Sequence, residues 1–291
     1  MKKPTTTLAS LKGKILETIS TERSKIGYSG FEFLQPLKKL YISLDDKERL
    51  HFRNTVLKML EGNEDLEAVI DICEFFKFRE CCPQLLCLIS NPPDTSMVDS
   101  FHVPKEHIQR NAIVAVERLR CKQAVPILDS LLLKEQRKKV AKDAITPPLA
   151  FPLLVSLAKL SPEKTSIYLG WCINLAKTVD QRTAEFVKTL DDWKRMEEMK
   201  IAPNLDFPTS GTGAGSIRLC LFSIAKKRGL KGLKAWLKSV ILLNEDDRNY
   251  LKIQLSYMLA GEDSFTNLKN LIKDKENPQS LGQELASLPS V

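Results

Sequence analysis

Residues 70–89 align without gaps with residues 113–132, at an offset of 43 residues along the chain. The five identical pairs are Ile70 and Ile113, Glu74 and Glu117, Pro83 and Pro126, Leu85 and Leu128, and Leu88 and Leu131. Each of the two prolines falls in the first turn of a predicted helix, where its fixed φ and missing N–H do no harm. An internal repeat of about 40 residues constrains the fold strongly, because each unit buries its apolar face against the next.

Apolar residues recur at helical spacing through almost the whole sequence. The predicted helices are 44–60, 64–78, 79–90, 107–120, 121–135, 147–160, 161–177 and 183–200, followed by four more between 217 and 274. Asp45 is suited to cap the first of these helices and Gly62 to end it, and Ser161 followed by Pro162 marks another helix start. Glycine is scarce and aromatic residues make up only 7% of the chain, which favours helix over sheet.

The segment NAIVAVERLRCKQAVPILDSLLL (111–133) combines a first helix of small apolar residues, a basic turn and the A-V-P-x-L start of a second helix. This unit resembles a HEAT repeat, and the resemblance is clear over residues 64–135. It implies an all-α protein, an α-solenoid in which antiparallel helix pairs stack into a single curved superhelix. It also implies a broad concave surface of the kind that binds macromolecules. HEAT motifs are degenerate, so they identify a fold and not a function.

Composition divides the sequence into four segments. A HEAT-like repeat region covers 1–203, and the Gly-rich stretch NLDFPTSGTGAGS (204–216) is predicted as a loop or linker. Residues 217–274 are predicted as C-terminal helical repeats, and the polar residues 275–291 as a flexible tail. A long loop is expected at 91–104, inside the repeat region.

Basic residues are concentrated in two places, although the formal net charge of the whole chain is only +8. Residues 217–240 include seven basic residues and no acidic one. In a helix spanning 225–240, four of its lysines follow the spacing i, i+4, i+7 and i+11 and would share one face. With the neighbouring arginine, this basic stripe consists of Lys227, Arg228, Lys231, Lys234 and Lys238. A secondary basic cluster consists of Arg137, Lys138, Lys139 and Lys142.

The basic stripe has two interpretations. It either holds an acidic partner, such as phosphates, an anionic membrane surface or an acidic protein segment, or it is the solvated face of a helix. The absence of acidic residues favours a partner, whereas the excess of lysine over arginine disfavours bidentate phosphate recognition. We therefore predict a non-enzymatic interaction scaffold that binds a macromolecule, above all a protein with an acidic surface, through this helix and the concave surface.

No motif in the sequence amounts to a catalytic or metal site. GTGAGS (211–216) lacks the lysine of a phosphate-binding loop, and no predicted strand precedes it. Cys81, Cys82 and Cys87 lack the paired spacing of a zinc site, and only three histidines are present. The sequence therefore predicts no catalytic residue, no metal and no cofactor.

A nucleic-acid-binding function is the alternative. Some HEAT-like folds resemble DNA glycosylases, which use concave tryptophans and a carboxylate beside a basic groove. The residues of these types are Trp171, Trp193 and Trp236, with Asp191 and Asp192. That family's motifs do not match this chain residue by residue, so no catalytic role follows from the resemblance. The simpler interpretation places Trp171 and Trp236 in the core and leaves Trp193 partly exposed.

The chain shows no apolar run of the roughly 18–20 residues needed to cross a bilayer. Its basic start is interrupted by Lys12 and Lys14, unlike the apolar stretch of a signal peptide. The seven cysteines are odd in number and fall inside helical apolar patterns, as is typical of buried free thiols in a reducing compartment. We therefore expect a cytoplasmic or, in a nucleated cell, a nuclear protein.

Overall fold

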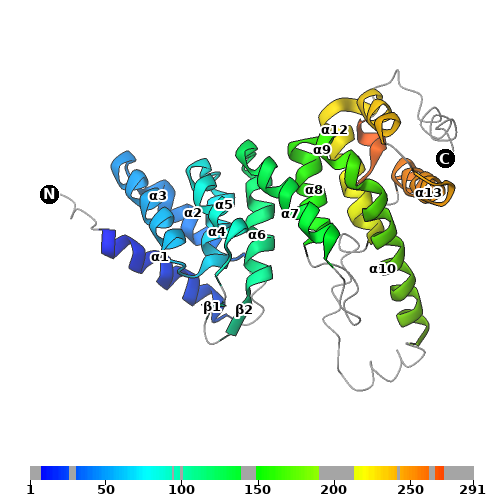
Figure 1. Ribbon diagram of the computed structural model, residues 1–291. Helices are drawn as coiled ribbons and strands as arrows, with labels where there is room; N and C mark the ends of the chain where they lie inside the picture. Colours follow the sequence, from blue (N-terminus) through cyan, green and yellow to red (C-terminus); the bar gives the residue numbers. More distant parts are fainter. Residues whose placement is uncertain are drawn as a thin grey trace. The chain divides into compact units, whose positions relative to one another are not determined.

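A computed structural model describes residues 8–25, 31–93, 95–98, 101–138, 149–189, 213–240, 243–261 and 266–271. The described chain is mainly α-helical, as the composition predicts, with one two-stranded antiparallel hairpin (Figure 1). It divides into two compact units, Met1–Ile127 and Leu128–Val291, and the division falls inside one helix. The predicted linker at 204–216 belongs to the second unit, and its residues 204–212 lie outside the described residues.

The described part of the first unit contains five α-helices before the hairpin, followed after it by α6, η2 and the start of α7. Its elements are α1 (Leu8–Arg23), α2 (Leu34–Ser43), α3 (Asp46–Glu61), α4 (Leu66–Phe75), η1 (Arg79–Cys81), α5 (Cys82–Ser90), β1 (Thr95–Val98), β2 (Phe101–Pro104), α6 (Lys105–Arg118), η2 (Lys122–Ala124) and the start of α7 (Val125–Arg137). Helix α3 packs against α1, α4 and α5, while α6 packs against both α4 and α5 (Figure 1). These helices therefore bury apolar surface against the adjacent helix or the next but one in sequence.

The start of α3 follows the prediction closely. The Asp45 carboxylate accepts a hydrogen bond from the Glu48 backbone N–H at 2.8 Å, and the Glu48 carboxylate accepts one from the Asp45 N–H at 3.1 Å. This reciprocal pair is a capping box, which satisfies two backbone donors that the helix leaves unpaired. Gly62 is the C-cap, also as predicted.

The two segments that align at an offset of 43 residues also share a backbone conformation in the turn after the first helix of each. The short η1 and η2 turns begin at Arg79 and Lys122, which are 43 residues apart. Before them, Lys77 and Arg120 both have a φ of 58°. The N–H of the next residue then bonds back to the helix in both turns, to Cys73 O at 2.9 Å and to Val116 O at 2.8 Å. Both α4 and α6 thus end in the same Schellman-type turn, with one residue in the left-handed region.

The loop expected at 91–104 is in part a β-hairpin. Strands β1 and β2 pair antiparallel, with Thr95 opposite Pro104 and Val98 opposite Phe101. Strands of four residues contain too few positions for an alternating pattern to be recognised, so the periodicity that predicts the helices gives no signal here.

An aromatic cluster forms part of the core of the first unit. Phe52 and Phe78 are buried, and Tyr41 and Phe76 lie against them with ring centroids 4.9–6.4 Å apart. Most of these rings meet edge-on or tilted, the arrangements that aromatic quadrupoles favour. The Arg53 guanidinium lies 5.3 Å from the centroid of the Phe78 ring. The cluster joins α2 and α3 to the turn that follows α4.

The second unit is built around a long broken helix. Its elements are α8 (Ala150–Leu160), α9 (Pro162–Thr165), η3 (Ser166–Tyr168), α10 (Leu169–Thr189), α12 (Gly213–Ser239), α13 (Glu245–Ala260) and η5 (Leu268–Leu271), after the rest of α7. Helix α12 packs against α8 and α10, and α13 packs against α10 and α12. Residues 190–212 and the predicted tail at 275–291 lie outside the described residues.

Two helix predictions in this unit are wrong. The expected break between 177 and 183 is absent, because α10 continues from Leu169 to Thr189. Helix α12 starts at Gly213, so residues 213–216 of the predicted loop are its first turn instead. Glycine is a poor helix former, but tertiary packing outweighs its low propensity at this position.

Candidate functional site

The basic stripe does not lie on one continuous helix. Gly229, in the middle of α12, has φ 70° and ψ 175°, a conformation that glycine adopts readily and other residues avoid. The predicted single helix over 225–240 is therefore wrong, and so is the common face of its four lysines. Lys227 precedes the break, and Lys231, Lys234 and Lys238 follow it.

Two residues of the stripe hold α12 in place. The Lys227 ammonium donates to the Leu160 carbonyl at 2.8 Å and to the Lys159 carbonyl at 3.4 Å, at the C-terminal end of α8. These carbonyls have no partner within their own helix, so Lys227 acts as a C-terminal cap. Arg228 forms an ion pair with Glu163 of α9. Both cations thus bind groups of the protein itself.

The other three lysines remain together after the break. Lys231, Lys234 and Lys238 are spaced by three and four residues, which places them on one face of a helix. Lys231 and Lys238 are exposed and Lys234 is half-buried. We call these three residues the lysine row. Among the described residues, no carboxylate pairs with Lys231 or with the exposed Lys226 just before the break.

The face next to the lysine row in the same segment is firmly buried. Leu230, Leu233 and Leu237 are at most 3% exposed. Trp236 is also buried, and its indole N–H donates to the Pro162 carbonyl at 2.7 Å. The segment is therefore amphipathic, with its orientation fixed by packing and by this hydrogen bond. The lysine row has to face away from the core.

The secondary basic cluster is only partly described. Arg137 and Lys138 are exposed at the end of α7, while Lys139 and Lys142 lie outside the described residues. Lys138 forms an ion pair with Glu135, whose side chain is almost completely buried. Lys138 therefore balances a buried carboxylate, as burial of a charge requires. No hydrogen bond or ion pair between described residues links this cluster to the lysine row.

A polar network between α10, α12 and α13 was not predicted. Asp180 accepts a hydrogen bond from the Tyr250 hydroxyl at 2.8 Å and one from the Ala214 N–H at 3.4 Å. Lys177 pairs with the buried Asp247 at 2.6 Å. Burial and the adjacent Asp180 raise the pKa of Tyr250 far above neutrality, so this phenol stays protonated. The network caps the start of α12 through the bond from the Ala214 N–H to Asp180.

A second unpredicted set of charges lies between α4 and α6. Glu67 pairs with His107 at 2.5 Å, and Glu74 pairs with Arg118. The hydrogen bond from His107 lowers the pKa of Glu67, and the same bond raises the pKa of His107. Asp71 lies on the same face of α4, and burial, with the negative charges of Glu74 and Glu67, raises its pKa to about 7. Only the three-dimensional pairing of the two helices reveals this group.

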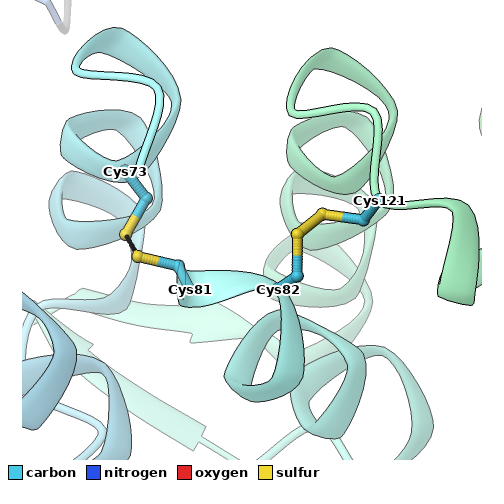
Figure 2. The surroundings of a disulfide bond; sticks show 4 residues. All are labelled: Cys73, Cys81, Cys82 and Cys121. Atoms are coloured by element: carbon cyan, nitrogen blue, oxygen red, sulfur yellow. Dashed lines mark hydrogen bonds between the residues drawn. A yellow bond between two sulfur atoms is a disulfide. The ribbon is translucent and has the colours of Figure 1, made fainter. Parts of the chain in front are cut away.

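The sequence led us to expect that all the cysteines are free thiols, and this prediction is wrong. Cys82, at the start of α5, forms a disulfide with Cys121, in the turn after α6, with Cα atoms 6.0 Å apart (Figure 2). Beside it, the Cys73 and Cys81 sulfur atoms are 2.6 Å apart. The hydrogen bond to Cys81, with burial, raises the pKa of Cys73. A raised pKa favours the protonated thiol, which is a weaker nucleophile than the thiolate.

Two buried thiols of the second unit also have raised pKa values. Burial raises the pKa of Cys172 and raises that of Cys220 to about 12. Within the described ranges, no three His, Cys, Asp or Glu side chains are arranged to hold a metal ion.

Two of the residues named for the glycosylase alternative, Trp171 and Trp236, lie in the described part of the chain. Trp236 is a core residue, as the simpler interpretation predicts, and Trp171 is half-buried. Trp193, Asp191 and Asp192 lie outside the described residues.

Among the described helices, none is both long and apolar enough to span a membrane.

Comparison of the chain with protein-family models, with curated proteins and with solved structures gave no match. The local repeat and the surfaces described above are therefore the basis for any statement about function.

Proposed function

We propose that this protein is a non-enzymatic scaffold of HEAT-like helical repeats that binds a protein partner with an acidic surface through the lysine row. The repeated turns after α4 and α6, 43 residues apart with matching backbone conformation, support the HEAT-like part of the proposal. Stacked helix pairs of this kind present extended surfaces that commonly bind macromolecules. The stacking of such pairs into a solenoid is part of the proposal.

The single observation that carries the binding function is the lysine row on its amphipathic helix. Three lysines face away from the core, and no acidic residue occurs between 213 and 240. An ordinary solvated helix face mixes charges of both signs, which stabilises it through pairs one turn apart. An acidic partner supplies the charges of opposite sign that this segment of the sequence lacks.

The row can hold an acidic protein through point charges alone. The row contains lysines only, and Arg228, the nearby arginine, already pairs with Glu163. Two-pronged recognition of a phosphate or a carboxylate uses the planar guanidinium group, whereas a lysine acts as a point charge toward either anion. Exposed ion pairs contribute about 0.2–1 kcal/mol each, so we expect weak, salt-sensitive binding through this row alone.

The test is charge reversal of the row in the full chain. The variant K231E/K234E/K238E is compared with K14E/K39E/K58E, which changes the net charge equally at exposed lysines of the first unit. Binding of a fluorescent oligoglutamate is measured by anisotropy at low and near-physiological salt, and circular dichroism monitors the fold. We expect the row variant to lose about tenfold in affinity and the control to retain most of it.

Equal loss in the two variants would show that only net charge matters and would reject the lysine row. The same variants are tested with a labelled DNA duplex and a single strand. Tight binding of either nucleic acid that weakens steeply with salt, together with no binding of oligoglutamate, would replace the proposal by the nucleic-acid alternative.

A further inference from the structure

Two turns of the first unit carry basic residues at equivalent positions. Lys77 and Arg120 occupy the left-handed position after α4 and α6, and Arg79 and Lys122 begin η1 and η2. All four side chains belong to exposed residues. We call these four residues the basic turn surface.

Backbone stability does not account for the residues at the left-handed positions. A residue with φ near +60° after a helix is usually glycine or asparagine, because a Cβ makes this conformation costly. The comparable helix ends in the described chain follow the rule, with Asn63 after α3 and Gly261 after α13. The two turns at Lys77 and Arg120 break the rule in the same way. A cation near a helix C-terminus interacts favourably with the helix dipole, which offsets part of this cost.

The helix dipole cannot explain the other two cations. Arg79 and Lys122 lie just before the N-termini of α5 and α7, where a positive charge is unfavourable. Of the acidic residues near Arg79 in sequence, Glu80 pairs with Arg53 and Glu74 pairs with Arg118. Among the described residues, no carboxylate pairs with any member of the basic turn surface. The repulsion at both helix starts is therefore unrelieved within the described residues.

The disulfide holds the two turns next to each other. Cys121 lies between Arg120 and Lys122, and Cys82 follows Arg79 by three residues. The Cys82–Cys121 bond keeps their Cα atoms 6.0 Å apart, as Figure 2 shows for the start of α5 and the turn after α6. All four cations thus belong to one edge of the first unit, and a covalent bond fixes the spacing of the two turns.

We propose that the basic turn surface is a second docking site, which binds an acidic peptide segment of a protein partner with carboxylates at each of the two turns. Carboxylate groups there remove the repulsion at the starts of α5 and α7. A nucleic acid fits less well, because Glu80 and Glu74 interrupt the positive charge and Phe78, the aromatic residue in the first turn, is buried and unable to stack on a base. The site lies in the first unit and does not depend on the lysine row.

The decisive variant is K77G/R120G, because it separates stability from binding. Glycine relieves the left-handed strain, so the melting temperature should rise, while the loss of two cations should weaken binding of labelled oligoglutamate. Charge reversal in one turn, as K77E/R79E or R120E/K122E, should lower the affinity about tenfold, and reversal in both turns should remove this binding. All variants are made in the K231E/K234E/K238E background, so that failure of the lysine row and failure of this site are distinguishable.

The proposal is supported if the K231E/K234E/K238E variant still binds oligoglutamate and charge reversal in both turns removes this binding. The circular dichroism spectrum must stay unchanged. Binding that survives reversal of both turns overturns it, and so does an unchanged affinity in K77G/R120G with a raised melting temperature. A third outcome is that the protein binds a labelled duplex but not oligoglutamate, and that the same variants abolish binding of the duplex. This outcome would assign the surface to nucleic acid and overturn the acidic-peptide proposal.

Discussion

Gly213, the first residue of α12, lies directly against Ala176 of α10. A Cβ placed on Gly213 would come within 2.7 Å of both the Ala176 Cβ and the Ala176 carbonyl oxygen. Real Cβ atoms do not approach backbone atoms so closely, and the backbone of a packed helix cannot move aside cheaply. This glycine therefore sets the distance between two helices of the second unit. It belongs to GTGAGS, which fails as a phosphate-binding motif, and its role is in packing.

We expect Gly213→Ala to destabilise the protein by about 1–3 kcal/mol, because the added methyl group overpacks the contact between α10 and α12. Urea unfolding followed by circular dichroism measures the change. The matched control is Gly13→Ala in the middle of α1, where a Cβ would meet nothing within 4 Å. That substitution should stabilise the protein by about 0.5–1 kcal/mol through helix propensity. Equal effects at both sites would contradict the packing role of Gly213.

Asp71 should make stability depend on pH near neutrality. Its pKa is raised from 3.8 to about 7 by burial and by Glu74 and Glu67, so the folded state prefers the protonated acid. The cost of ionising Asp71 in the folded state is complete above pH 7 and vanishes as pH falls toward 4. Asp71→Asn should therefore stabilise the protein by about 1–2 kcal/mol at pH 8, a figure reduced for partial exposure, and have little effect at pH 4.

Chemical denaturation of both proteins at several pH values between 4 and 8 tests this prediction. The fully exposed Asp46 provides the control, since Asp46→Asn should not reproduce the stabilisation at pH 8. A stabilisation by Asp71→Asn that is constant with pH would mean that Asp71 is ionised throughout.

Lys227 should contribute to stability rather than to partner binding. Lys227→Met removes the hydrogen bonds to the last carbonyls of α8 and should cost about 0.5–1.5 kcal/mol. The adjacent Lys226→Met removes the same charge from an exposed side chain and should change stability by no more than about 0.5 kcal/mol. Thermal melts distinguish the two. If Lys226→Met is the more destabilising, Lys227 is not the cap of α8.

The Cys82–Cys121 disulfide closes a long loop and should stabilise the first unit substantially. Its two cysteines are 39 residues apart, and loops of this length correspond to about 2–4 kcal/mol of stabilisation. The variant C82A/C121A should lose that amount in urea unfolding under oxidising conditions. Cys87→Ser, at an exposed free thiol, provides the control and should be nearly neutral. A reductant should lower the stability of the unmodified protein to that of the double variant.

The features predicted correctly are those that depend on neighbouring residues. The capping box at Asp45 and the position of Pro83 in the first turn of α5 follow from short-range stereochemistry, which the sequence displays directly. The 43-residue alignment likewise pairs Lys77 with Arg120, because a repeated turn needs a repeated local pattern. These features required no knowledge of which segments meet in space.

The features missed depend on contacts between distant residues or on a single backbone angle. In the sequence, Gly229 is recognisable only as a poor helix former. In the structure its φ of 70° breaks the helix and separates Lys227 from the other lysines of the predicted stripe. Cys121 aligns with Phe78 and not with another cysteine, so the repeat gives no hint of its bond to Cys82. Close approach across two adjacent turns decides whether that bond forms, and spacing along the chain does not determine it.

The same disulfide changes what happens when the backbone is cut. The segment between α5 and α6, which contains β1 and β2, lies entirely between Cys82 and Cys121. A protease that cleaves one peptide bond in this segment leaves two fragments joined through sulfur. The nicked protein would migrate as a single species on a non-reducing gel and separate into two only after reduction. Insertions or cleavage sites engineered at the hairpin should therefore leave the first unit covalently intact.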